Sequence, residues 1–174
     1  KARAIIEEKN PNLENKEQTA ESVGVGAVVF SALWNNRIKD IVFSYDKVLN
    51  FDGETAPYVQ YTYARSKSAL RKGGEYDLNN IDLSSITDDD GYEVVKSILT
   101  FGDAVKQSAK LREPNVVTRH IVDLAEKFNR FYIGHRIVVD DERVKNARLM
   151  LTDIVGRTIK EGLALLGIDA PEVM

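Results

Sequence analysis

The stretch FDGETAPYVQYTYAR, residues 51–65, combines the signals of a helix start with an unusual helix surface. Thr55 is of a residue type that caps helices, and Pro57 falls in the first turn, where its missing N–H costs nothing. Three tyrosines and an arginine lie between positions 58 and 65, where a surface helix ordinarily carries Lys and Glu. The stretch therefore predicts a helix, and it raises the question of what requires flat rings and a guanidinium on its surface.

Two stripes run along this predicted helix. The stripe expected to be buried consists of Val59, Tyr63, Ser66 and Leu70. The neighbouring aromatic and basic stripe consists of Tyr58, Tyr61, Arg65 and Lys72. The helix thus separates a core face from a face that carries rings and positive charge.

Upstream of this helix, apolar residues at helical spacing predict a helix over 19–34, with Thr19 as its N-cap. Gly24 and Gly26 weaken that helix, and we expect them to allow the close approach of another backbone. Residues 37–51 alternate only loosely and predict an extended connector with one turn of helix.

Downstream, residues 92–111 have helical spacing, and we expect a break at 101–103 with Asp103 capping a second helix. Pro114 is expected to open the next helix. The core stripe of that helix is predicted to be Val117, Ile121, Leu124, Phe128 and Phe131.

The last predicted helix begins at the acidic residues 140–142, where the helix dipole favours negative charge, and Gly167 is expected to cap its end. Its predicted buried face is Val144, Ala147, Leu151, Ile154 and Thr158. Residues 73–93 hold seven acids and no Lys or Arg, and they predict an exposed loop. From residue 55 onward, the pattern predicts an all-α helical bundle.

Composition excludes several classes of site. The chain has no cysteine and only two histidines, so disulfides and cysteine-based metal sites are excluded, and we expect no metal site. No apolar run approaches the roughly 18 residues of a membrane span. Phosphate-loop, serine-hydrolase and zinc-protease motifs are absent. We therefore expect no catalytic residue and no cofactor in this chain, and a binding function.

Aromatic and arginine planes grip unpaired bases by stacking, at roughly 1–3 kcal/mol per base. Tyr61 with Arg65 is one such pair, and Tyr132 with Arg136 is a second, one helical turn apart and beside Asn129. The alternative is that these tyrosines pack in the core of a helical protein-interaction or structural domain.

Four segments resemble class I arginyl-tRNA synthetases. They are VGVGAVVFSALWNNRIKDIVFSYDKVLNFDGETAPYVQYTYAR at 23–65, FNRFY at 128–132, RLMLTDIV at 148–155 and LLGIDAPEVM at 165–174. The resemblance covers nearly the whole chain except 73–93. It implies that residues 1–54 are the end of a catalytic domain and that residues 55–174 form an all-α anticodon-binding domain.

The resemblance also implies a function and a site. The longer parent protein would attach arginine to its tRNA, using ATP with Mg, and its ATP motifs would precede residue 1. The chain itself would be an inactive fragment that binds the anticodon loop of arginine tRNA. The anticodon contacts are expected at Tyr61, Arg65, Tyr132 and the final residue, Met174, with Asn129 and Arg136 as weaker candidates.

We further expect a cytoplasmic monomer without membrane association, in which the catalytic domain of the same chain is the second partner. A related alternative is the helical anticodon domain of another class I synthetase, such as the enzymes for cysteine and methionine. The lack of a cysteine-rich insertion and the APEVM ending argue against it.

Overall fold

The computed structural model describes residues 1–36, 38–40 and 42–174. In that part of the chain the secondary structure is helical and contains no strand, so the all-α prediction is confirmed. The elements are α1 (Ala2–Lys9), α2 (Lys16–Trp34), α3 (Tyr45–Val48), α4 (Ala56–Gly73), the short 3₁₀ helix η1 (Leu83–Ile86), α5 (Asp89–Leu111), α6 (Asn115–Gly134) and α7 (Glu142–Leu165).

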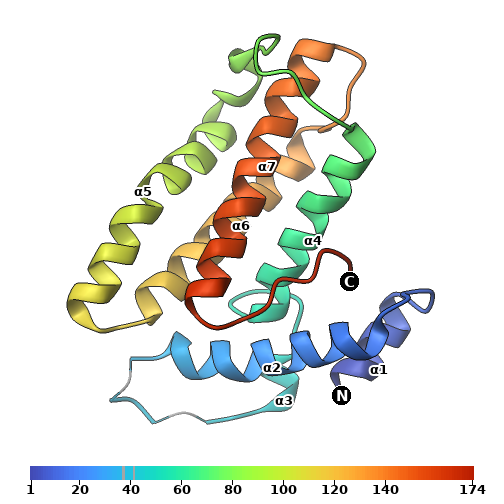
Figure 1. The fold of residues 1–174 in the computed structure, drawn as a ribbon. Coiled ribbons are helices and arrows are strands. Elements are labelled where there is room, and N and C mark those ends of the chain that lie inside the picture. The colour runs from blue at the N-terminus through green and yellow to red at the C-terminus, as the bar shows by residue number, and fades with distance from the viewer. Residues whose placement is uncertain (37, 41) are drawn as a thin grey trace.

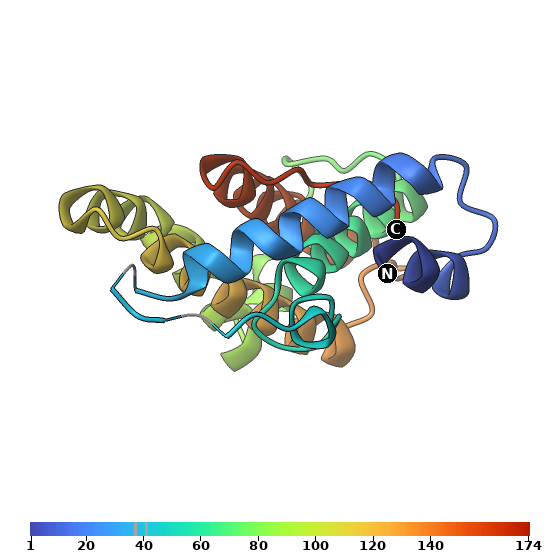
Figure 2. The same ribbon diagram turned by 90° about the horizontal axis from the view of Figure 1, so that it is seen from below.

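Helices α4, α5, α6 and α7 form a bundle, and α2 lies across one end of it with α1 beside it (Figures 1 and 2). Within the bundle, α4 packs mainly on α7 and α5 packs mainly on α6. The core stripe predicted for α6 is confirmed, because all five of its members are buried. No helix in the described ranges is both long and apolar enough to cross a bilayer.

The buried face of α7 differs from the predicted one. Ala147 and Leu151 are buried as expected, but Ile154 is 36% exposed, and Val155 and Ile159 are buried instead. The reason is that α7 contacts α4, α5, α6 and η1. A helix enclosed on several sides buries more than one stripe, so a single periodic face describes it poorly.

The predicted break at residues 101–103 is wrong, because α5 is one continuous helix. Phe101 and Val105 pack against the main core on either side of Gly102. This packing offsets the roughly 1 kcal/mol that a glycine costs in a helix. Asp103 is not a cap and instead pairs with Lys106, at 3.3 Å.

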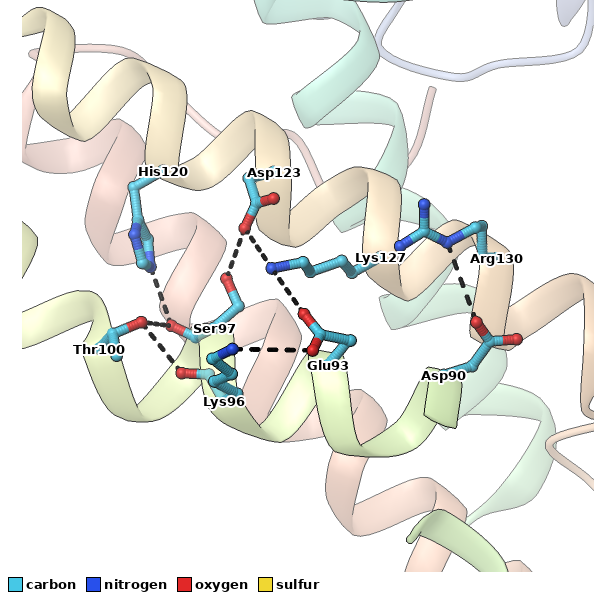
Figure 3. A network of polar contacts seen from close by, with 9 residues as sticks. All are labelled: Asp90, Glu93, Lys96, Ser97, Thr100, His120, Asp123, Lys127 and Arg130. Carbon is cyan, nitrogen blue, oxygen red and sulfur yellow. Dashed lines mark hydrogen bonds and ion pairs between the residues drawn. The ribbon is translucent and has the colours of Figure 1, made fainter. Parts of the chain in front are cut away.

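Polar contacts also hold α5 along α6 (Figure 3). The Lys127 ammonium lies 2.8 Å from Asp123 and 3.2 Å from Glu93. Partial burial opposes the charge of Lys127, but its hydrogen bonds to both carboxylates outweigh burial and raise the pKa of Lys127. Ser97 donates to Asp123 at 3.2 Å, and a ring nitrogen of His120 lies 2.9 Å from the Ser97 carbonyl oxygen.

Helix α2 begins earlier than predicted, at Lys16, so Thr19 is a buried residue inside the helix and not its cap. The approach to Gly26 is made by side chains and not by a backbone, since a Cβ there would meet Gln60 at 2.9 Å and Ile168 at 3.0 Å. Of the predicted connector 37–51, positions 37 and 41 lie outside the described residues. The remainder contains α3 as its one helical turn, as expected.

The acidic stretch 73–93 is only partly a loop. Asp88 caps α5 by accepting from the Gly91 N–H at 2.9 Å, so the acidic run belongs to a helix start. The loop before it is anchored on α7, because the Tyr76 hydroxyl donates to Asp153 at 2.9 Å. Burial, the hydrogen bond to Asp153 and the charge of that carboxylate raise the pKa of Tyr76.

Helix α7 ends as predicted at a glycine. Gly167 has φ +71°, and the Ile168 N–H donates to the Leu163 carbonyl at 2.9 Å, which closes the helix end. The following residues 167–174, called here the tail, run from the end of α7 across α4 toward α1 and α2 (Figure 1).

Candidate nucleic-acid interface

Helix α4 starts as its sequence predicts. The Thr55 side chain accepts a hydrogen bond from the Tyr58 N–H at 3.3 Å, and Pro57 lies in the first turn. The Thr55 hydroxyl also donates to the Asn50 carbonyl at 2.6 Å, which ties the helix start to the preceding turn. These contacts set the direction of α4 and the position of its aromatic stripe.

Arg65 of α4 lies between two tyrosine rings. Its guanidinium carbon is 4.9 Å from the ring centroid of Tyr61, one turn earlier, and 5.3 Å from that of Tyr132 on α6. Tyr61 is 39% exposed, and Tyr132 is half-buried and rests against Phe128, with ring centroids 5.9 Å apart. The two tyrosines of the pairs that the sequence suggested, Tyr61 and Tyr132, thus both lie at the Arg65 guanidinium.

Asn129 of α6 connects Arg65 to two other side chains of α4 by hydrogen bonds. Its side-chain oxygen accepts from the Arg65 guanidinium at 2.6 Å. Its amide nitrogen donates to the Tyr58 hydroxyl at 3.0 Å and to the Thr62 hydroxyl at 2.9 Å. Asn129 is only 8% exposed, and its side chain makes its hydrogen bonds to residues of α4.

The charge of Arg65 is not neutralised within the described part of the chain, since no carboxylate forms an ion pair with it there. Its partners are the neutral Asn129 amide and two ring faces. A half-buried guanidinium in this setting can hold a phosphate or the edge of a base.

Met174 lies close to Tyr61. Both residues line a cavity of about 420 Å³ together with Ile6, Asn10, Phe51 and Asp52. The Phe51 ring meets Tyr61 edge to face, with centroids 6.4 Å apart. This cavity volume falls in the range of about 300–1,000 Å³ that is usual for ligand sites.

Arg136 does not join this cluster as a helical neighbour of Tyr132. Helix α6 ends at Gly134, and His135 is extended, with φ −129° and ψ 113°. Arg136 is therefore an exposed residue beyond the helix, and its carbonyl accepts from the Arg148 guanidinium at 2.8 Å. The predicted one-turn spacing from Tyr132 to Arg136 on one helix is wrong for this reason.

A model of the DALR anticodon binding domain family matches residues 59–174. The chain belongs to this family. The matched residues include α4 from Val59 onward and all of α5 to α7, and with them Tyr61, Arg65, Asn129 and Tyr132. They also include the tail with Met174, whereas α1, α2 and α3 precede the matched residues.

Relatives extend this similarity over the segment that precedes the DALR domain. The chain is 49% identical over all of its 174 residues to an arginine–tRNA ligase of Halothermothrix orenii, of which it covers 31%. It is 51% identical, over 98% of its length, to an arginine–tRNA ligase of Alkaliphilus metalliredigens, of which it covers 30%. The chain thus spans less than a third of the length of these curated relatives.

Solved structures of two arginyl-tRNA synthetases contain the same fold. The fold matches the arginyl-tRNA synthetase of Thermus thermophilus with a TM-score of 0.93 and 40% identity, over 99% of this chain and 30% of that one. The arginyl-tRNA synthetase of Plasmodium falciparum matches with a TM-score of 0.85 and 27% identity, over 99% of this chain and 31% of that one.

The sequence alone did not indicate every residue of the site. Ile6, Asn10 and Phe51 precede the DALR domain yet line the cavity beside Tyr61. No local motif marks them, because they reach Met174 only through the fold. Among the described residues, no group of His, Asp and Glu side chains could hold a metal ion.

Proposed function

We propose that this chain binds the anticodon loop of an arginine-accepting tRNA, as part of an arginine–tRNA ligase. The observation that carries the proposal is the Arg65 guanidinium between the rings of Tyr61 and Tyr132, on a chain of the DALR family. Unpaired bases are bound by this combination of ring faces and a planar cation.

Each residue has a distinct role in the proposal. Tyr61 offers an exposed ring on which a base stacks, and Tyr132 supports Arg65 from the other side. Arg65 contacts a phosphate or a base edge, while the adaptable side chain of Met174 fills the cavity wall beside Tyr61. Asn129 acts through Arg65, and Arg136 contacts the RNA backbone from outside the cluster.

We propose the wider setting on the same grounds. Residues 1–54 are the end of a catalytic domain, residues 55–174 are the anticodon-binding domain, and the longer protein attaches arginine to tRNA using ATP with Mg. Exposed apolar side chains before α4 support an intramolecular contact there, namely Val25, Val28, Ile38, Val42, Phe43 and Tyr45. The proposal places the longer protein in the cytoplasm as a monomer.

The test is the affinity of the chain for an arginine tRNA anticodon stem-loop, compared at one stated salt concentration with a stem-loop of unrelated anticodon. We expect tighter binding of the arginine loop. Arg65→Ala removes the contact with the phosphate or base edge, and Tyr132→Ala removes the ring that supports Arg65. Each should weaken that binding about 10- to 150-fold, which corresponds to the loss of about 1.5–3 kcal/mol for a hydrogen bond to a charged group.

Arg119→Ala is the matched control. Arg119 also lies over an aromatic ring, 5.7 Å from Trp34, and is exposed, but it is not part of the Tyr61–Arg65–Tyr132 cluster. Arg119→Ala removes one positive charge, as Arg65→Ala does, and should leave unchanged the ratio of affinities for the arginine and unrelated stem-loops. Equal binding of both stem-loops by the unmodified chain would refute base recognition, and unchanged affinity in Arg65→Ala would remove Arg65 from the site.

A further inference from the structure

The tail is fastened to one face of α4. Gln60, Tyr63, Lys67 and Arg71 follow at spacings of three and four residues and therefore share that face. Gln60 donates to the Asp169 carbonyl at 2.7 Å. The other three residues all reach a single residue of the tail.

That residue is Glu172. Its carboxylate accepts from the buried Tyr63 hydroxyl at 3.3 Å and lies 3.5 Å from the Lys67 ammonium. Its carbonyl accepts from the Arg71 guanidinium at 3.4 Å. Burial, followed by the charge and hydrogen bond of Glu172, raises the pKa of Tyr63 to about 12, so the hydroxyl stays a donor over the usual pH range.

A second anchor holds the end of the tail on α1. The Asn10 amide, immediately after α1, donates to the Met174 carbonyl at 3.2 Å. Met174 itself packs on a small apolar cluster built by α1 and α2, which contains Ile6, Ala20 and Val23. The tail therefore spans from α4 to the elements that precede the DALR domain.

The two anchors bracket the Met174 side chain, which shares the cavity wall with Tyr61. The tail follows the end of α7 and contains no helix or strand, so side-chain contacts fix its path. An unanchored tail samples many conformations, and Met174 would then face Tyr61 only part of the time.

We propose that Glu172 and Asn10 are positioning residues that set base selectivity by holding Met174 beside Tyr61. This inference rests on the proposed function, since it assigns the cavity to a base. It adds that the cavity is shared between the DALR domain and α1, so that the preceding segment takes part in recognition.

The chain offers a direct readout, because Met150 and Met174 are its only methionines. Labelling with ¹³C-methyl methionine gives one signal for each. In Glu172→Ala and Asn10→Ala, the Met174 signal should shift toward that of an exposed, mobile methionine. The Met150 signal, from a side chain on α7 that packs against the main core, should stay in place and report an intact fold.

Binding gives the functional readout. In both variants the ratio of affinities for the arginine and unrelated stem-loops should fall about three- to tenfold, the range expected from losing one ordinary hydrogen bond. Glu172→Gln keeps an oxygen for the Tyr63 hydroxyl and should restore part of the ratio. Glu161→Ala removes an equivalent exposed acid from α7 and should change neither readout.

The outcomes separate the two proposals. If the unmodified chain binds both stem-loops equally, the proposed function fails and this inference fails with it. If the unmodified chain discriminates but Glu172→Ala and Asn10→Ala do so equally well, only the positioning role is overturned. If the Met174 signal does not shift in Glu172→Ala and Asn10→Ala, the positioning role is also overturned, regardless of how tightly these variants bind RNA.

Discussion

Replacing Asn129 with alanine removes the residue that joins α4 to α6 beneath the candidate site. The side chain is 8% exposed and makes three hydrogen bonds, to Arg65, Tyr58 and Thr62. Alanine can make none of them. Asn129→Ala should therefore reduce both the stability of the fold and the affinity for RNA.

The magnitude follows from these contacts. Two neutral hydrogen bonds contribute about 0.5–1.5 kcal/mol each, and a bond to a charged group about 1.5–3 kcal/mol. The Arg65 bond belongs near the lower end because that side chain is only partly buried. The free energy of unfolding should thus fall by about 2.5–4.5 kcal/mol. Losing the 2.6 Å contact that orients Arg65 should also weaken stem-loop binding about 3- to 10-fold.

The assay is urea unfolding followed by circular dichroism, together with titration of the arginine stem-loop under conditions where the variant is folded. Asn146→Ala is the matched control. Asn146 is also a buried asparagine, but it makes one hydrogen bond, to the Asn80 carbonyl at 2.9 Å, away from the ring cluster. The free energy of unfolding of the Asn146→Ala variant should fall by about 1–2 kcal/mol, and its affinity for RNA should stay unchanged.

One pattern of results would refute this reasoning. If Asn129→Ala unfolds at the same urea concentration as the unmodified chain, the buried network does not stabilise the fold. If it is destabilised but binds RNA as tightly as Asn146→Ala, the orientation of Arg65 by Asn129 does not matter for binding.

Three further predictions concern packing and ionisation. Gly162→Ala should lower the free energy of unfolding by about 1–3 kcal/mol, because its Cβ would overlap the buried Ile121 side chain, and urea unfolding measures this. Gly102→Ala meets nothing within 4 Å inside α5, so it should raise stability by about 0.5–1 kcal/mol in the same assay, and a loss would contradict that account. Burial and Glu172 raise the pKa of Tyr63 from 10.0 to about 12 in the folded chain. As the pH rises, the Tyr63 hydroxyl therefore loses its proton in the unfolded chain before it does in the folded chain, and the free energy of unfolding should fall between about pH 10 and 12. Unfolding midpoints of Tyr63→Phe over that pH range should decline less steeply than those of the unmodified chain, and equal slopes would exclude the assignment.

The sequence correctly predicted those helix ends that are fixed by capping contacts between residues close together in the chain. Thr55 caps α4, Asp141 caps α7 and Gly167 closes α7, each through contacts to backbone within a few residues. The prediction at 101–103 failed because one glycine is a weak signal against the packing of α5 along α6. The start of α2 was placed too late because Thr19 is of a residue type that caps helices, although it lies buried inside α2.

By itself, the sequence determined the all-α class, the buried stripe of α6 and the pairing of Tyr61 with Arg65 one turn apart on α4, because helical periodicity and capping are local. Only the tertiary structure brought Arg65 between Tyr61 and Tyr132 and made Asn129 a buried anchor, since these depend on how α4 packs on α6. The cavity lined by Asn10 and Met174 was also decided only by the tertiary structure. A contact between residues 164 positions apart depends on the path of the whole chain, which no local pattern encodes.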